Sequence, residues 1–222
     1  MFIFPVHIFN PTSITARIVE SVISGGVALS GEEDVIATDG GGRWEIAFEG
    51  VTLRTPAQIK AWEAWEGYLG RGKTDCLVPI LSLAHANRPV HGRLPLVASK
   101  LVYDDPVFPT SVAYSASAIA ATIGAAAALR ATIVAITVAK GAALVGGEKF
   151  SVGGRGYRVV RPLGAGFYQI EPPLREAVSA GATCIFDWPF IKCRSAPGES
   201  WSPALQFGRR GEASIRFLEN AA

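Results

Sequence analysis

The chain has 222 residues, of which 49% are hydrophobic and 18% charged, and its formal net charge is +2. This composition supports a sizeable core and excludes wholesale disorder, and the near-neutral charge argues against a dedicated binder of nucleic acid or anionic membranes. Cys76, Cys184 and Cys193 are widely spaced and form no C-x-x-C pair. They indicate free, partly buried thiols in a reducing cytosol, and support neither a zinc site nor a disulfide framework.

The first 42 residues predict a strand followed by a loop. Residues 1–13 lack the basic start of a signal peptide, and Pro5 interrupts their apolar run. Residues 14–28 are β-branched and partly alternating, which predicts a strand. Residues 30–42 are polar and end in glycines, which predicts a loop. The acidic residues of this loop are Glu32, Glu33, Asp34 and Asp39.

A half-buried strand and a capped helix are expected next. Over residues 43–53, apolar and polar side chains alternate, as in a strand with one buried face. Thr55 then suits a helix N-cap, Pro56 the first helical position and Gln58 the third position of a capping box. Apolar residues follow at spacings of three and four, which predicts a helix face that packs into the core. These residues are Ile59, Trp62, Trp65 and Leu69.

Residues 67–74 read GYLGRGKT and satisfy the P-loop pattern G-x-x-x-x-G-K-[ST]. A P-loop follows a strand and opens a helix, so that backbone amides face the phosphates. Here the glycines follow a helix and precede the apolar segment 74–80, which predicts a strand. The glycines therefore indicate a helix C-cap, and no nucleotide site is predicted.

Residues 81–99 predict an irregular segment, and residues 106–129 carry no charge. The second stretch is long enough for a membrane helix, but it consists mostly of Ala, Ser and Thr and lacks a basic flank or aromatic belt. We therefore expect no membrane span.

From about residue 131 the pattern changes to short strands separated by turns, which favours a small barrel or sandwich. The predicted strands lie near 131–138, 148–152, 156–161, 167–171, 182–188 and 211–219. With one helix and many strands, the fold class is mainly β.

No catalytic, cofactor-binding or metal-binding residues are predicted. The spacing of His85 and His91 suits no common metal pair, and His7 is the only other histidine. No G-x-S-x-G elbow occurs, and nothing in the spacing of Glu171 and Glu176 places them across a sugar. We expect a protein that is not an enzyme and needs no cofactor.

Two stretches of the sequence carry a resemblance to a known family. The first, residues 41–80, reads GGRWEIAFEGVTLRTPAQIKAWEAWEGYLGRGKTDCLVPI, in which a strand runs into an A-x-A-W-E-A helix and a basic glycine turn. It resembles the N-terminal region of distal tail proteins of long-tailed phages and prophages. Residues 147–182, GEKFSVGGRGYRVVRPLGAGFYQIEPPLREAVSAGA, resemble their second module. The two stretches cover about a third of the chain, in the family's order. The Ala-rich stretch 115–130 departs from the family's pattern and leaves the junction of the two modules undefined.

The resemblance implies a β-sandwich hub domain flanked by one α-helix and a small OB-like barrel inserted before the last strand of the hub. The hub would comprise residues 1–100 with 192–222, and the insert residues 101–191. It further implies a structural virion protein, made in the host cytoplasm and located at the tail tip. Its copies would form a ring, expected to be a homohexamer, that contacts the tail tube protein and the tail-tip hub protein, with DNA passing through the lumen.

We hypothesise that the acidic loop with Glu32, Glu33, Asp34 and Asp39 lies at a ring or lumen surface. A different ring component of the tail, such as a tube or terminator subunit, is an alternative to a distal tail protein. A single-stranded nucleic-acid-binding OB protein is another, and Tyr157, Arg158, Arg161, Phe167 and Tyr168 would supply its basic and stacking groups. A carbohydrate-binding or hydrolytic tip protein is a third, although the sequence offers no carboxylate geometry for it.

Overall fold

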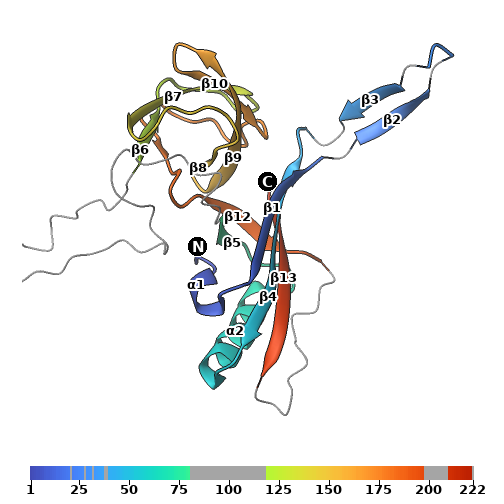
Figure 1. The fold of residues 1–222 in the computed structure, drawn as a ribbon, viewed down its shortest axis with the longest axis vertical. Coiled ribbons are helices and arrows are strands. Elements are labelled where there is room, and N and C mark those ends of the chain that lie inside the picture. Colours follow the sequence, from blue (N-terminus) through green and yellow to red (C-terminus); the bar gives the residue numbers. More distant parts are fainter. Residues whose placement is uncertain are drawn as a thin grey trace, which may run out of the picture.

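The computed structural model is mainly β, as predicted (Figure 1). It describes residues 1–20, 22–27, 29–31, 33–37, 40–80, 119–197 and 210–221. In chain order the elements are α1 (Val6–Phe9), β1 (Ser13–Val19), β2 (Val22–Val27), β3 (Glu33–Ala37), β4 (Arg43–Leu53), α2 (Pro56–Leu69), β5 (Cys76–Pro79), β6 (Ala120–Ile123), β7 (Ile133–Lys140), β8 (Lys149–Val152), β9 (Arg155–Gly164), β10 (Phe167–Glu171), β11 (Thr183–Cys184), β12 (Phe190–Ser195) and β13 (Gly211–Glu219).

The strands form two main sheets and a separate ribbon. The hub contains a five-stranded antiparallel sheet in the order β1-β4-β13-β12-β5. The barrel is a six-stranded sheet in the order β11-β6-β7-β10-β9-β8, and an antiparallel bridge between Ser151 and Ile185 joins its two ends. Since β5 precedes the barrel and β12 follows it, the barrel is inserted into the hub. The ribbon β2–β3, which we call the arm, projects away from both bodies (Figure 1).

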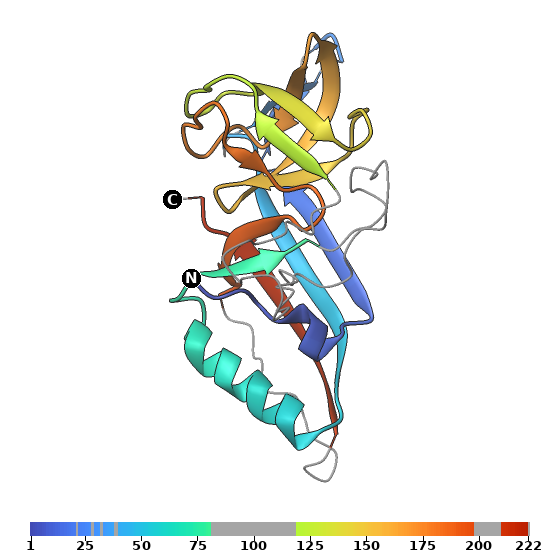
Figure 2. The same cartoon turned by 90° about the vertical axis from the view of Figure 1, so that its left-hand side faces the viewer.

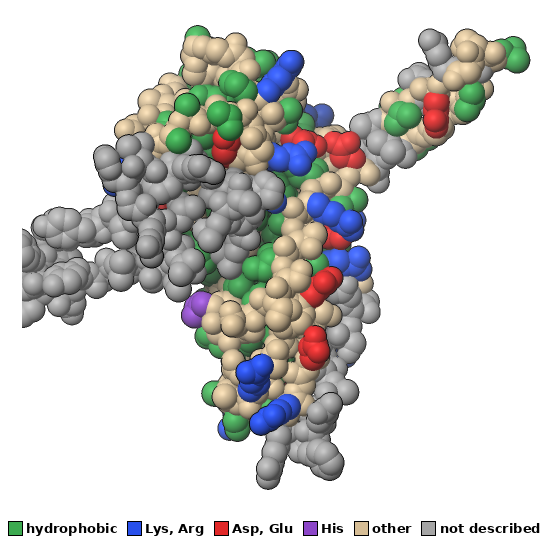
Figure 3. Space-filling model, in the orientation of Figure 1, with side chains coloured by type: hydrophobic (Ala, Val, Ile, Leu, Met, Phe, Trp, Pro, Cys, Tyr) green, Lys and Arg blue, Asp and Glu red, His purple; other side chains and the backbone are tan. Residues whose placement is uncertain are grey.

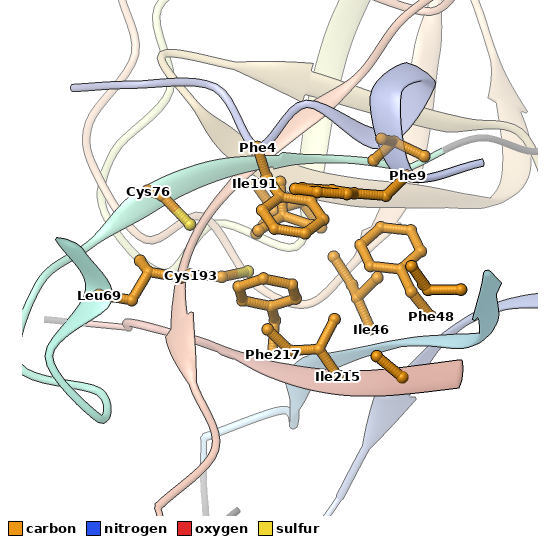
Figure 4. Packing of buried hydrophobic residues seen from close by; sticks show 14 of the residues in the cluster. Phe4, Phe9, Ile46, Phe48, Leu69, Cys76, Ile191, Cys193, Ile215 and Phe217 are labelled. Carbon is orange, nitrogen blue, oxygen red and sulfur yellow. The ribbon is translucent and has the colours of Figure 1, made fainter. Parts of the chain in front are cut away.

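The hub buries one face of its sheet against α2 and the N-terminal segment (Figure 2). Along β4, buried residues alternate with more exposed ones, because successive side chains of a strand point to opposite faces. Phe4 contributes to the same core, where its ring stacks on Phe48 and meets Phe217 edge-on, with centroids 5.6 and 4.9 Å away (Figure 4). The core thus joins the two ends of the chain to the central strands.

The capping box predicted for α2 is present. The Thr55 side chain accepts a hydrogen bond from the Gln58 N–H, the Gln58 side chain accepts one from the Thr55 N–H, and Gly70 ends the helix in the left-handed conformation. Of the apolar stripe, Trp62 and Leu69 are fully buried, and Ile59 and Trp65 are partly buried against the same core. The GYLGRGKT glycines therefore lie at the end of a helix.

The strand β3 was not predicted, because residues 33–37 were assigned to a polar loop. Their apolar members Val35 and Ile36 pair with Ser24 and Ile23 of β2, so the chain continues as a ribbon beyond β1 and β4. Three further elements were missed: α1, β6 and β12. Each is short, with four or six residues.

The inserted barrel ends, and the hub resumes, before Phe190, because β12 begins there and pairs with β5 in the hub sheet. The predicted boundary between 191 and 192 would cut this strand. Of the predicted strand 182–188, only Thr183–Cys184 forms β11.

Within the described hub, the layer facing the five-stranded sheet consists of α2 and the N-terminal segment.

The described part of the chain contains no helix long and apolar enough to cross a membrane. Of the uncharged stretch 106–129, residues 106–118 lie outside the described residues, as do the predicted irregular segment 81–99 and the first part of the Ala-rich stretch.

Candidate functional site

No metal-binding group of three or more His, Cys, Asp or Glu side chains occurs within the described ranges. His7 is exposed on α1, and His85 and His91 lie outside the described residues. Two other features distinguish the molecule: a polar junction, where hub, barrel and arm meet, and an exposed apolar arm.

Arg175 is at the centre of the junction. Its Nη2 donates to the backbone oxygen of Gly42, at the base of the arm, and its Nε lies 3.5 Å from Oε1 of Glu219, at the end of β13. The Glu219 side chain is fully buried and its Oε2 accepts the Trp44 N–H at 3.0 Å. One guanidinium of the barrel thus contacts both the arm base and the last strand of the hub.

A second arginine ties β9 of the barrel to the C-terminal segment. Arg155 is only 4% exposed, and its Nε donates to Oε1 of Glu176 at 2.8 Å. Its Nη1 donates to the backbone oxygen of Asn220, whose side-chain amide donates to the Asp75 carboxylate at 2.9 and 3.1 Å. The segment EPPLRE, residues 171–176, therefore supplies Arg175, which contacts the hub directly, and Glu176, which holds Arg155 in place.

Trp44 crosses the same boundary with its side chain. It is fully buried, and its Nε1 donates to the backbone oxygen of Gly156 on β9 at 2.8 Å. Gly156 is required there, because an added Cβ would lie 2.3 Å from Cδ1 of the buried Ile191. Lys149 of β8 lies over the Trp44 ring at 5.5 Å and donates to the Ala16 oxygen at 2.9 Å. The two bodies are therefore joined by close packing as well as by charge.

Burial raises the pKa of Glu219 above its ordinary value of 4.5, while the Trp44 N–H and the cations Arg175 and Arg155 oppose this shift. The folded protein therefore holds this proton more tightly than the unfolded chain does. The contribution to stability is fully present below the unfolded pKa and is lost as pH rises through the folded pKa.

We predict that the unfolding free energy of Glu219→Gln increases relative to that of the wild type as pH rises above 4.5. The reason is that glutamine keeps an acceptor for the Trp44 N–H and does not ionise. Urea denaturation of both proteins at pH 4 and pH 7 measures this difference in unfolding free energy. A difference that stays constant between the two pH values would contradict the assignment.

The acidic residues predicted at a ring or lumen surface belong in part to the arm. Glu33 opens β3, and its Oε1 accepts a hydrogen bond from the Ser24 hydroxyl at 2.6 Å. Asp34 follows it in β3. Glu32 and Asp39 lie outside the described residues.

Apolar side chains on the arm are the more prominent feature, and the sequence reading missed them (Figure 3). Five large hydrophobic residues of the arm are each at least 54% exposed: Ile23, Val27, Leu29, Val35 and Ile36. Ile23 and Ile36 face each other across the ribbon, and Val35 lies on its opposite face. The signal was present as β-branched residues on both sides of a polar turn, but it was interpreted as one strand and a loop.

A ribbon of two strands is marginally stable in water by itself, and it gains stability when an apolar face packs against another surface. Neither sheet of the described chain pairs with the arm. The arm therefore has the properties of an element that is completed by a partner.

The two edges of the hub sheet differ. At the β5 edge, the Leu77 N–H donates to the Phe2 oxygen at 2.9 Å and the Leu77 oxygen accepts the Phe4 N–H at 2.8 Å, so the N-terminal segment covers this edge. At the other edge, β1 pairs with β4 and with no other described strand. One sheet edge is thus covered by the N-terminal segment, and beside the other, β1, no further described strand is paired.

The barrel residues considered for stacking on nucleic acid bases do not form a platform. Tyr157 is fully buried, and its hydroxyl accepts a hydrogen bond from the backbone N–H of Arg175 at 3.2 Å. Burial raises the pKa of Tyr157 to about 12. Tyr168 packs partly into the barrel core, Arg158 is paired with Glu171, and the Arg161 Nε donates to Gln169. Of the aromatic residues in this group, only Phe167 is largely exposed.

A scan against protein-family models finds no match for this chain, and a search of curated proteins finds no significant relative.

Proposed function

We propose that this chain is a structural subunit of a phage-like tail that assembles with copies of itself into a ring between the tail tube and the tail tip. The exposed arm is the observation that carries the proposal. A subunit with this role needs surfaces for its neighbours and no catalytic groups.

The asymmetry of the molecule supports a ring. An arm on one part of the subunit and the edge strand β1 on another would allow a head-to-tail contact, in which two different surfaces meet. Such heterologous contacts generate a closed ring when the rotation between neighbours fits. A contact between identical surfaces would instead favour a twofold dimer.

The sheet face opposite α2 supports passage of DNA. Its side chains on β1, β4 and β13 alternate with those of the core and carry both signs of charge. The charged residues on these three strands are Arg17, Arg43, Arg216, Glu45, Glu49 and Glu212, and β12 adds Lys192 and Arg194 to the same face. Because acids are interspersed with the bases, this face would attract a passing phosphate backbone less than a uniformly basic surface would. We therefore propose it as the surface nearest the lumen.

The decisive experiment compares the purified chain with an arm variant, Ile23→Asp/Ile36→Asp, by light scattering and negative-stain electron microscopy. We expect rings of several subunits from the wild type and monomers from the variant, because two charges would be desolvated in each contact. Circular dichroism and the melting temperature should be nearly unchanged, since both side chains are largely exposed in the monomer.

Leu129→Asp/Val145→Asp is the matched control, because both residues are exposed on the barrel and should leave assembly intact. Glu32→Ser/Glu33→Ser/Asp34→Ser tests the acidic residues separately, and unchanged ring formation and tail assembly would remove them from the interface. A wild-type chain that stays monomeric at high concentration and binds single-stranded oligonucleotides at low salt would contradict the ring and favour the nucleic-acid alternative.

A further inference from the structure

Cys76 and Cys193 are far apart in sequence but are directly opposite each other in the hub sheet. They are partners in the antiparallel pair of β5 and β12, and both are fully buried in the hub core. Directly opposite residues of a ladder point to the same side of a sheet. Figure 4 shows both sulfur atoms on the core side of these strands.

The hydrogen bonds around the pair define its geometry. Both backbone groups of Leu77 bond to the N-terminal segment, so those of the preceding Cys76 face β12. Lys192 likewise turns its backbone groups toward Gly154 and Asn220, so those of Cys193 face β5. The cysteines therefore occupy a hydrogen-bonded pair, for which the Cα separation is about 5.5 Å.

That separation lies within the range that a disulfide spans, about 4.4–6.8 Å between Cα atoms. The Cβ atoms of a hydrogen-bonded pair lie near the upper end of about 4.5–5.5 Å, and a disulfide needs about 3.5–4.5 Å, so the strands must approach each other by roughly 1 Å. Since β5 has only four residues and lies near the edge of the sheet, it can make this adjustment.

We propose that Cys76 and Cys193 are a redox-active pair that closes to an intramolecular disulfide across β5 and β12 when the protein meets an oxidising solution. The bond would join the strand from which the chain leaves the hub to the strand on which it returns, so the whole barrel would lie within the closed loop. Formation of this disulfide does not depend on the proposed ring assembly.

The oxidant is a low-molecular-weight disulfide such as oxidised glutathione. The thiolate of one cysteine attacks a sulfur of this disulfide and releases one small thiolate, which leaves a mixed disulfide. The thiolate of the second cysteine then attacks the sulfur of the first cysteine in this mixed disulfide and releases the second small thiolate. Two electrons pass from the cysteines to the small disulfide, and the two S–H protons end on the two released thiols.

Local opening of the sheet controls the rate of this reaction. Burial raises the pKa of Cys76 to about 12, with a smaller contribution from Asp75, and raises that of Cys193 well above its ordinary value. Thiolate is therefore scarce in the closed sheet, and the reaction requires β5 to separate from its neighbours. Closing a loop of this length restricts the unfolded chain strongly, so the oxidised form should be the more stable.

The test incubates the full chain with oxidised glutathione over a series of urea concentrations below the unfolding midpoint, so that burial alone cannot prevent reaction. Free thiols are then alkylated under denaturing conditions and the peptides are mapped without reduction. We expect a Cys76–Cys193 peptide whose yield rises with urea, and a melting temperature that is roughly 5–15 °C higher and returns on reduction.

Cys184 is the internal control, because it is buried in the barrel core and its strand partner is Ala121. Cys184→Ala should form the same disulfide, and Cys193→Ala should leave Cys76 alkylated or bound to glutathione. Absence of the Cys76–Cys193 peptide from the wild type at every urea concentration would overturn the proposal, and so would pairing of either residue with Cys184.

Discussion

Replacement of Arg175 by alanine is expected to lower the free energy of unfolding by about 3–5 kcal/mol at pH 7, the usual cost of removing one partner of a buried ion pair. Arg175 is the nearest cation to the buried Glu219, and it also satisfies the Gly42 oxygen. Without it, the carboxylate is left with the Trp44 N–H and the more distant Arg155. Urea denaturation at pH 7 measures the loss.

Two comparisons separate this effect from a general loss of charge. Because protonated Glu219 needs no cation, the loss should be smaller at pH 4, and Arg175→Ala/Glu219→Gln should recover part of it. Arg17→Ala is the matched control, since Arg17 pairs with Glu45 at 2.8 Å but its side chain is 63% exposed. Such a surface pair contributes about 0–1 kcal/mol. Equal losses in the Arg17 and Arg175 variants would refute the role of the junction.

Replacement of Trp44 by alanine is expected to have an effect of similar size, about 3–5 kcal/mol, because it leaves a large cavity in a close-packed core. It also removes the hydrogen bond to Gly156 and the ring beneath Lys149, so it should weaken the connection between hub and barrel. Differential scanning calorimetry should then resolve separate hub and barrel transitions where the wild type shows one.

Trp62→Ala provides the comparison of equal size within the hub. Trp62 is also fully buried, but it belongs to α2 and meets Phe9 edge-on with ring centroids 5.0 Å apart, within the hub core. Its loss should destabilise the hub by a similar amount without a specific effect on coupling to the barrel. If both variants separate the transitions to the same degree, the special role of Trp44 is wrong.

Local patterns predicted several elements closely. The strand over 43–53 and the helix that begins after Thr55 depend on alternation, a capping box and glycine at the C-cap, all of which are contained in a few consecutive residues. The strands 167–171 and 211–219 were placed correctly for the same reason. The arm was misread because Gly25 and Gly26 interrupt the alternation of β2, and its register with β3 shifts between Ser24 and Val27.

The junction could not be derived from the sequence. Arg175, Glu219 and Trp44 lie in three distant segments, and each alone is an ordinary charged or aromatic residue. The EPPLRE segment drew attention through a resemblance and through the spacing of Glu171 and Glu176, and neither assigned a contact to Arg175. The pairing of Cys76 and Cys193 could not be derived from the sequence either. Their wide spacing argued against a disulfide framework, and only the sheet register shows that they are opposite each other.

The sequence by itself determined the mainly β class, the capped helix α2 with its buried stripe, and the absence of a P-loop at GYLGRGKT, because period, capping and turn chemistry act between residues a few positions apart. The tertiary structure decided which residues meet: the arm, beside which no other described strand pairs, the Arg175–Glu219 pair beneath the barrel, and the cysteines facing each other across β5 and β12. These contacts depend on strand order and register, which are set by how two cores pack as wholes and not by any single segment.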